Sequence, residues 1–304
     1  MKPDLSVEIC GLKLKNPVMP SSGSFGLPGY EEYMDLNGLG ALVVKSITLN
    51  PRLGNPPPRI AETTAGMLNA VGIQNPGVKW FIENDLPLLK RFTPPLIVSI
   101  AGTTVEEFAQ ATELLEKEEG IAAYEINVSC PNIEAGGRAF GMSAAATQAV
   151  VAAVRKRTRR PIFTKLTPNV TDIVEIAQAA VEAGSDGLTL INTLLGMAID
   201  VKLRRPVLAN VLGGLSGPAI KPVALRCVYQ VAQAVKVPII GTGGISSATD
   251  VLEFLLAGAS AVQVGTANIV DPYAMLKIIA DLEKYLAENN VASVREYIGA
   301  LKTH

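Results

Sequence analysis

Short apolar runs rich in β-branched residues alternate along the chain with longer segments in which apolar residues recur every three or four positions. The short runs predict buried strands of a parallel sheet, and the longer segments predict amphipathic helices that cover it. The predicted strands span residues 18–21, 41–45, 96–100, 124–128, 162–166, 187–191, 238–241 and 261–264. The predicted helices span residues 105–117, 143–157, 172–183, 219–235, 248–257 and 272–288.

Eight strand signals interleaved with helical signals indicate a (β/α)8 barrel, the TIM-barrel architecture. The chain has 304 residues, 48% of them hydrophobic, and no linker or low-complexity stretch divides it. We therefore predict a single barrel domain over residues 1–304, with a doubly wound open sheet as the alternative. Residues 48–79 contain five prolines and no clear periodic pattern, which predicts a long loop acting as a functional cover or an interface element.

Composition narrows the class of protein. The formal charge of −1 offers no strong basic field for nucleic acid or an anionic membrane. No apolar run approaches the ~20 residues of a membrane span, and the first residues lack signal-peptide features. Three widely separated cysteines argue against a disulfide framework or a metal site, and they favour the reducing cytoplasm.

Histidine chemistry is also excluded by composition. The only histidine, His304, is the last residue of the chain. Dyads in which histidine activates serine or cysteine, and zinc centres built on histidines, are therefore ruled out. Any acid–base chemistry must come from cysteine, lysine, aspartate, glutamate or tyrosine.

Polar residues follow several of the predicted strands, at the end of the barrel where active sites of this fold form. They are Lys45 and Ser46 after the second strand, Asn127, Ser129, Cys130 and Asn132 after the fourth, Lys165 in the fifth, Asn192 and Thr193 after the sixth, Gly243 and Gly244 after the seventh, and Gly265 and Thr266 after the eighth. We expect these side chains and glycines to converge on one mouth of the barrel.

The glycines and lysines of this set indicate an anionic ligand. Glycines after the last two strands let backbone N–H groups approach a phosphate, although tight strand-to-helix turns are an alternative. Lys45 and Lys165 lie in apolar strands, where a buried ammonium group needs an anion or a dipole. An ion pair inside the barrel would explain them. Their position near a phosphate site favours a cofactor such as a flavin, whose reduced ring carries negative charge.

Cys130 lies in a loop that continues through Gly136 and Gly137. A free cysteine is more often a buried core residue than a reactive one, but loops at this mouth carry function more often than packing. The position favours a reactive role and leaves a packing role open. Nearby asparagines supply the paired donors and acceptors that a planar amide or imide ligand needs.

Three motifs resemble those of family 1 dihydroorotate dehydrogenases. They are NVSCPN at residues 127–132, LNAVGIQNPG at 68–77 and GTGGI at 241–245, and the likeness extends from residue 16 to residue 272. The resemblance implies an oxidoreductase that converts dihydroorotate to orotate in pyrimidine (UMP) biosynthesis, with FMN as hydride acceptor. Membrane-bound family 2 members have a serine as base and an N-terminal extension, so Cys130 favours a soluble member.

Residues 133–141, IEAGGRAFG, resemble the NAD-linked subclass rather than the fumarate-linked one. That subclass implies a heterotetramer of two catalytic chains and two partner chains, with the catalytic chains forming a homodimer. The partner chains would carry FAD and an iron–sulfur cluster and pass electrons to NAD. Three cysteines are too few for a cluster in this chain itself, which agrees with a separate electron-transfer subunit.

The resemblance also implies a role for individual residues. Cys130 matches the catalytic base. The positions that hold FMN match Ser22, Lys45, Ser46, Asn127, Lys165, Ile191, Gly217, Gly243, Gly244, Gly265 and Thr266. The positions around the substrate match Lys45, Asn69, Ala70, Val71, Gly72, Ile73, Asn127, Asn192 and Thr193, and we expect Asn132 to join them. Related sequences commonly have asparagine near the flavin where this chain has Ser99, so that flavin contact is the one departure.

Three alternatives remain at this stage. The chain could be a fumarate-linked homodimeric dihydroorotate dehydrogenase, or a dihydropyrimidine dehydrogenase-like reductase acting on uracil or thymine. It could also be a non-catalytic FMN-binding barrel, although lysine, cysteine and asparagine around one mouth argue against this. Gly136 and Gly137 further predict that the loop bearing Cys130 opens and closes over substrate.

Overall fold

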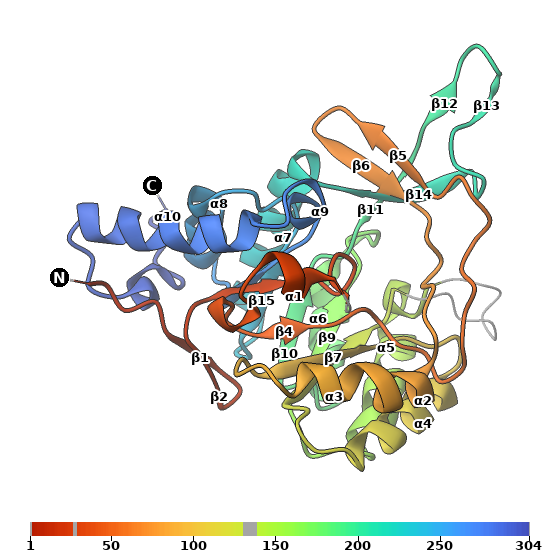
Figure 1. Cartoon of the computed structure of the whole chain (residues 1–304), viewed down its shortest axis with the longest axis horizontal. Coiled ribbons are helices and arrows are strands. Elements are labelled where there is room, and N and C mark those ends of the chain that lie inside the picture. The colour runs from red at the N-terminus through yellow and green to blue at the C-terminus, as the bar shows by residue number, and fades with distance from the viewer. Residues whose placement is uncertain (1, 27–28, 130–138, 304) are drawn as a thin grey trace.

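The computed structural model describes residues 2–26, 29–129 and 139–303, and its centre is an eight-stranded sheet with helices around it (Figure 1). The strands are β3 (Val18–Pro20), β4 (Leu42–Val43), β7 (Leu96–Ile100), β8 (Ala123–Asn127), β9 (Ile162–Leu166), β10 (Gly187–Leu190), β15 (Ile239–Thr242) and β16 (Ala261–Val264). Their order is β3-β16-β15-β10-β9-β8-β7-β4, and every neighbouring pair is parallel.

The two ends of this sheet meet. The Gly40 N–H, just before β4, donates to the Val18 carbonyl of β3 at 2.9 Å. A Cβ at residue 40 would lie 2.1 Å from the Asn16 carbonyl oxygen, so glycine is needed for this close approach. The sheet is therefore a nearly closed barrel, as predicted, and the open-sheet alternative is wrong.

The helices lie where the apolar periodicity predicted them, with bounds within two residues of the prediction. They are α4 (Val105–Glu116), α5 (Ala144–Arg155), α6 (Ile173–Glu182), α7 (Lys221–Ala234), α8 (Ala248–Leu256) and α10 (Ala274–Glu288). Side-chain oxygens of Thr104, Ser143 and Ser247 cap the N-termini of α4, α5 and α8. None of the helices in the described ranges is long and apolar enough to cross a membrane.

Several short elements were not predicted. The helical ones are α1 (Tyr30–Tyr33), η1 (Leu36–Gly38), α2 (Val78–Trp80), the π-helical η2 (Phe81–Asp85), α3 (Leu86–Leu89), η3 (Phe140–Met142), η4 (Pro218–Ile220), α9 (Thr266–Val270) and η5 (Val294–Tyr297). The strands are β1 (Val7–Ile9) and β2 (Leu12–Leu14), which form a hairpin, and β12 (Ile199–Asp200) and β13 (Arg205–Pro206), which form another. These elements are too short to carry a periodic signal.

A second, antiparallel sheet lies at the carboxyl end of the barrel strands. It consists of β5 (Ile60–Thr63), β6 (Gly66–Asn69), β11 (Leu194–Met197) and β14 (Leu212–Ser216), in the order β11-β14-β6-β5 (Figure 1). Strands β5 and β6 fall within residues 48–79, where we predicted a loop without secondary structure. That prediction was wrong because the hairpin gains its partner, β14, from a segment about 145 residues further along the chain.

The wall of the barrel is apolar and its interior is partly polar. The largest fully buried side chains, among them Tyr124, Phe163 and Phe254, fill the layer between sheet and helices. Residues of the opposite strand faces, including Ser99, Glu125 and Gln263, are also almost fully buried. Because buried polar groups need hydrogen-bond partners, this interior layer fixes the side chains that lead to the barrel mouth.

Candidate active site

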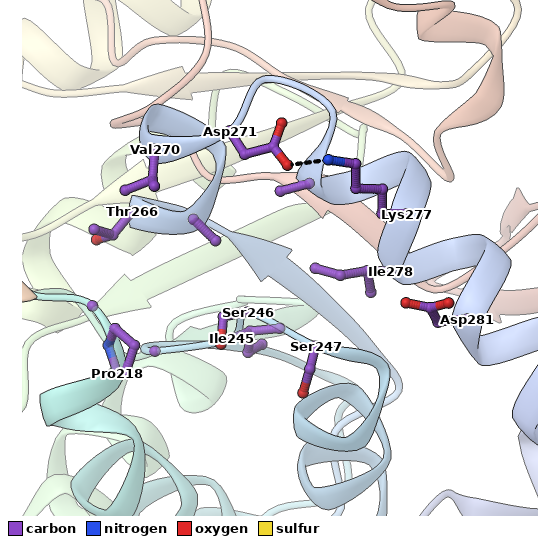
Figure 2. A pocket seen from close by; sticks show the side chains of 14 residues that line it. Pro218, Ile245, Ser246, Ser247, Thr266, Val270, Asp271, Lys277, Ile278 and Asp281 are labelled. Carbon is purple, nitrogen blue, oxygen red and sulfur yellow. Dashed lines mark hydrogen bonds and ion pairs between the residues drawn. The ribbon is translucent and has the colours of Figure 1, made fainter. Parts of the chain in front are cut away.

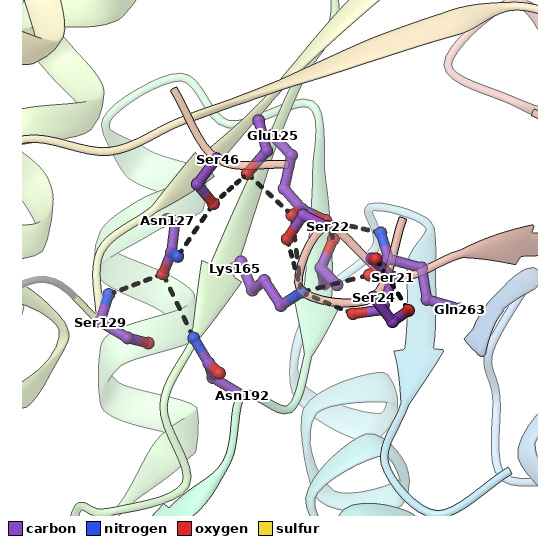
Figure 3. A network of polar contacts seen from close by, with 12 residues as sticks. Ser21, Ser22, Ser24, Ser46, Glu125, Asn127, Ser129, Lys165, Asn192 and Gln263 are labelled. Carbon is purple, nitrogen blue, oxygen red and sulfur yellow. Dashed lines mark hydrogen bonds and ion pairs between the residues drawn. The ribbon is translucent and has the colours of Figure 1, made fainter. Parts of the chain in front are cut away.

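Five of the predicted site residues form one connected cluster at the barrel mouth. Ser46 follows β4, Asn127 ends β8, Lys165 lies in β9 and Asn192 follows β10, while Ser22 follows β3. The Asn127 amide donates to Ser46 Oγ at 3.3 Å and accepts from Asn192 Nδ2 at 3.2 Å (Figure 3). The parallel register pairs Asn127 with Lys165, so the cluster follows from strand order and register.

The two asparagine side chains have fixed orientations. The Ser129 backbone N–H donates to Asn127 Oδ1 at 3.2 Å, and the Thr193 backbone N–H donates to Asn192 Oδ1 at 2.8 Å. A backbone N–H only donates, so the oxygen of each amide is identified by its partner. Each NH2 group consequently keeps an N–H for a ligand in the mouth.

Lys165 is almost fully buried, and its ammonium group is surrounded by oxygen atoms. Its Nζ donates at 3.3 Å to Ser21 Oγ, Ser22 Oγ and Gln263 Oε1, and it lies 3.5 Å from Glu125 Oε1 (Figure 3). The ion pair that the sequence left open as an explanation for a buried lysine is therefore present. It accounts for the burial of Lys165, although it does not exclude a ligand at the same ammonium group.

Lys45 differs from Lys165 in its surroundings. Burial, and to a smaller extent the neighbouring Lys165 ammonium, lower the pKa of Lys45 below that of an ordinary lysine. Among the described residues no carboxylate lies within 4.0 Å of its Nζ. An anionic group bound at the mouth would compensate this charge, which makes Lys45 the stronger candidate for a ligand contact.

One residue of each predicted glycine motif, Gly244 and Thr266, lines a separate cavity of about 410 Å³ (Figure 2). Gly217, Gly244 and Thr266 form one side of it, and Lys277 and Asp281 of α10 form another. Two helical segments begin there, η4 after Gly217 and α9 after Gly265, and neither has a side-chain cap at its N-terminus. At η4 the Ala219 N–H already donates to the Ala65 carbonyl at 2.9 Å, so α9 is the segment that offers uncapped N–H groups. Such groups attract a phosphate, so the cavity fits the phosphate of a mononucleotide such as FMN.

Gly244 shows why glycine is required in this cradle. Its φ of +81° lies in the left-handed region, and a Cβ there would lie 2.9 Å from the Gly217 carbonyl oxygen and 3.0 Å from the Lys221 backbone N. Gly243 also has a positive φ, of +129°. Of the other predicted cofactor contacts, Ile191 is buried directly after β10, and Ser99 is buried in β7. Ser99 hydrogen-bonds Ser46 and Glu125.

The predicted substrate segment 69–73 begins at the end of β6. Asn69 pairs with Gly214 of β14, and its amide donates to the Gly214 carbonyl at 3.4 Å. Thr193 packs against the same glycine, because a Cβ at residue 214 would lie 2.1 Å from Thr193 Oγ1. The second sheet thus connects residue 69 with Thr193. Ala70 is buried, and Val71, Gly72 and Ile73 are half-buried.

Cys130 and Asn132 lie outside the described residues, as do Gly136 and Gly137. Both described ends of this segment are fixed at the mouth: the Gly141 N–H donates to the Val128 carbonyl at 2.7 Å. The other two cysteines have no features of a base at neutral pH. Burial, and secondarily Asp186, raise the pKa of Cys10 to about 12, and burial raises the pKa of Cys227.

Sequence reasoning missed three polar residues of the barrel interior, namely Glu125, Thr189 and Gln263. Each lies in an apolar strand and is at most 1% exposed. The argument that singled out Lys165, a charged residue within an apolar run, applies equally to Glu125 between Tyr124 and Ile126. The sequence therefore contains a signal for Glu125, but it contains none for the contacts among Glu125, Thr189 and Gln263.

Comparison with known proteins assigns the family. The family model described as dihydroorotate dehydrogenase matches residues 4–286. The chain belongs to the dihydroorotate dehydrogenase family. It is 57% identical over 302 residues to "Dihydroorotate dehydrogenase B (NAD(+)), catalytic subunit" of Geobacter metallireducens, covering 99% of both chains. It is 58% identical over 301 residues to the protein of the same name from Desulforudis audaxviator, covering 99% of this chain and 98% of the relative.

These relatives confirm the prediction of an oxidoreductase of the NAD-linked dihydroorotate dehydrogenase class. Among solved structures, a dihydroorotate dehydrogenase of Eimeria tenella in complex with ferulenol has a TM-score of 0.80 and covers 98% of this chain and 88% of its own. At 24% identity this likeness supports the barrel fold alone.

Proposed function

We propose that this chain oxidises dihydroorotate to orotate with Cys130 as base and passes the electrons through a partner subunit to NAD. The observation that carries the proposal is the cluster of Lys165, Lys45, Asn127 and Asn192 at one barrel mouth, with an uncapped phosphate cradle beside it. A flat, anionic amide and a mononucleotide are the two ligands that this combination fits.

The residues divide the reaction between them. The Cys130 thiolate takes the proton from carbon 5 of dihydroorotate, and the C5=C6 double bond forms as the hydride leaves carbon 6. FMN, when bound, supplies the acceptor for that hydride. Asn127 and Asn192 orient the ring through their remaining N–H groups. Lys45 and Lys165 stabilise the negative charge that develops as the proton leaves.

Ser22, Ser46, Lys165 and Asn127 would hold the ring of FMN, while Gly217, Gly243, Gly244, Gly265 and Thr266 would hold its phosphate. Asn69, Ala70, Val71, Gly72, Ile73, Thr193 and Asn132 would surround the substrate. We further propose that the chain is cytoplasmic, forms a homodimer, and assembles with two subunits that carry FAD and an iron–sulfur cluster. The relatives are named as a catalytic subunit, which supports a partner of this kind.

The decisive variant is Cys130→Ala. We expect it to keep bound FMN and its yellow spectrum but to lose most bleaching by dihydroorotate under nitrogen, because a methyl group cannot accept the proton. Cys130→Ser should be weak but detectable, since serine is a poorer base at neutral pH. Cys227→Ala, which removes a buried thiol of α7, serves as the control and should bleach at the wild-type rate.

Two results would contradict the proposal. Near wild-type bleaching of Cys130→Ala would show that another group takes the proton. Bleaching of wild type by dihydrouracil but not by dihydroorotate would favour the dihydropyrimidine dehydrogenase-like alternative. Copurification with an electron-transfer subunit encoded by a neighbouring gene, followed by an NAD-reduction assay, tests the proposed transfer of electrons to NAD.

A further inference from the structure

Glu125 is a fully buried carboxylate inside the barrel, below the cluster at the mouth. Its Oε1 accepts from Ser99 Oγ at 3.2 Å and lies 3.5 Å from Lys165 Nζ. Its Oε2 accepts from Gln263 Nε2 at 2.6 Å and from Thr189 Oγ1 at 3.2 Å (Figure 3). Four strands other than its own therefore supply a donor or a cation to one side chain that the proposed chemistry does not use.

The first consequence concerns charge. An ionised carboxylate is expensive to bury unless it is paired and hydrogen-bonded, and Glu125 has both kinds of partner. Gln263 donates to Glu125 and accepts from Lys165, so it ties the two charges into one unit. The Glu125 carboxylate inside the barrel therefore partly offsets the positive charge that Lys165 presents at the mouth.

The second consequence concerns the direction of hydrogen bonds. An ionised carboxylate only accepts, so the Ser99 hydroxyl donates to Glu125. Ser99 Oγ, 2.9 Å from Ser46 Oγ, must then accept from the Ser46 hydroxyl, and Ser46 Oγ accepts from the Asn127 amide. Asn127 in turn accepts from Asn192.

All four links of this chain point toward the carboxylate. The amide orientations at its outer end are fixed independently, by the backbone N–H groups of Ser129 and Thr193. The direction imposed from Glu125 and the direction imposed by the backbone agree. A reversed Ser46 hydroxyl would confront the Asn127 NH2 group with a second donor.

We propose that Glu125 is a positioning residue that sets the hydrogen-bond direction of the Ser99 and Ser46 hydroxyls, so that Ser46 accepts from Asn127, and that it tunes the charge of Lys165 toward the flavin. The inference rests on the proposed function, since it assumes that FMN and orotate bind at this mouth. It assigns two separable effects to one side chain, one on the flavin through Lys165 and one on the substrate through Ser99 and Ser46.

Glu125→Gln tests the first effect in the FMN-loaded protein. The substitution keeps the size of the side chain but removes the charge that offsets Lys165. We expect the equilibrium of bound FMN to shift toward its reduced form by at least tenfold, which is about 30 mV for a two-electron couple. Orotate affinity, measured by flavin absorbance, should fall about tenfold, because a glutamine NH2 can reverse the chain at Ser99.

Ser99→Ala tests the effect on the substrate separately from the effect on the flavin. This test remains possible even if the Glu125→Gln variant does not fold. It breaks the link to Ser46 and leaves the Glu125–Lys165 pair in place. We expect orotate affinity to fall about tenfold while the flavin potential stays at the wild-type value. Thr189→Val is the matched control, because it removes one donor to Glu125 but lies on neither path, and both quantities should stay near wild type.

The outcomes distinguish the inference from the function beneath it. The inference alone fails if wild type binds FMN and is bleached by dihydroorotate while the variants behave like wild type. In that case Ser99→Ala would bind orotate with wild-type affinity, and folded Glu125→Gln would keep the wild-type flavin potential. If Ser99→Ala shifts the potential as much as it weakens orotate binding, the assignment of two separate paths is overturned. If wild type neither binds FMN nor reacts with dihydroorotate, the proposed function fails and the inference fails with it.

Discussion

Lys45 and Lys165 lie at the same barrel mouth, yet the groups that surround their ammonium groups differ. Lys165 has Glu125 as an ion-pair partner and three further oxygen acceptors. The pKa of Lys45 is lowered by burial and by the Lys165 ammonium. A site with a cation that has no carboxylate partner among the described residues gives up stability in the ligand-free state, as functional sites commonly do.

Lys45→Met should therefore stabilise the ligand-free protein at neutral pH. The folded-state pKa of Lys45 is below the ordinary value of about 10.4, so the charged form of this side chain opposes folding. The resulting loss of folding free energy disappears as the pH rises from the folded-state pKa to the ordinary value. We expect the thermal midpoint at pH 7 to rise by about 2–4 °C, as ~1 kcal/mol gives in a domain of this size. The gain should vanish near pH 11, and orotate binding should weaken at every pH. An unchanged midpoint at pH 7 would show that Lys45 carries no such penalty.

The cysteines give a second prediction at the residue scale. Cys10 has a pKa raised to about 12, and the thiol of Cys227 is buried. Iodoacetamide at pH 8 should thus modify Cys130 first, orotate should protect it, and Cys130→Ala should remain almost unlabelled. Mass spectrometry of tryptic peptides measures this. Rapid labelling of Cys10 at pH 8 would contradict the raised pKa.

At the scale of elements, the turns after β14, β15 and β16 line the cavity that we propose to hold phosphate. The segments η4 and α9 begin at this cavity without side-chain caps, whereas α4, α5 and α8 are capped by a hydroxyl group. At α9 this leaves the first backbone N–H groups available for a ligand or water.

Gly244→Ala tests this cradle. Its positive φ and the 2.9 Å approach to the Gly217 carbonyl predict a loss of about 1–2 kcal/mol in stability and at least tenfold weaker FMN binding. Gly184→Ala is the control, since residue 184 also has a positive φ, of +104°, and ends α6 away from the cavity. It should lower stability similarly but leave FMN affinity unchanged. Equal FMN affinity in the two variants would show that Gly244 does not contribute to FMN binding.

At the scale of the whole molecule, exposed apolar side chains gather on the arm formed by β11 to β14. The group comprises Leu195, Met197, Ile199, Val201, Leu203, Val211 and Leu212. The hairpin of β12 and β13 extends away from the barrel (Figure 1). Exposed apolar side chains concentrated in one segment are typical of an interface, and we expect a second copy of the chain to cover them in the proposed homodimer.

Ile199→Asp should convert the dimer to a monomer in light scattering after size-exclusion chromatography, because it places a charge within that surface. Leu301→Asp, at an exposed apolar residue near the C-terminus, is the control and should leave the mass unchanged. A dimer that persists in Ile199→Asp would show that the chains meet elsewhere.

The sequence by itself determined the barrel, the family and most of the candidate residues. Local pattern suffices for the barrel, since apolar runs and helical periodicity are set by residues close in the chain. Motifs such as residues 127–132 suffice for the family. The strand-end rule brought Lys45, Asn127, Lys165 and Asn192 to one mouth before their contacts were known.

Only the tertiary structure decided what those residues touch. The β5–β6 hairpin depends on β14, and the environment of Lys165 depends on Glu125, Ser21, Ser22 and Gln263 from three other strands or the turns that follow them. Such contacts join residues as far apart in the chain as Met67 and Ser216, and pairing across that distance leaves no periodic trace in the sequence. The charge balance at the mouth and the direction of its hydrogen bonds are therefore properties of the closed barrel, because closure alone brings those strands together.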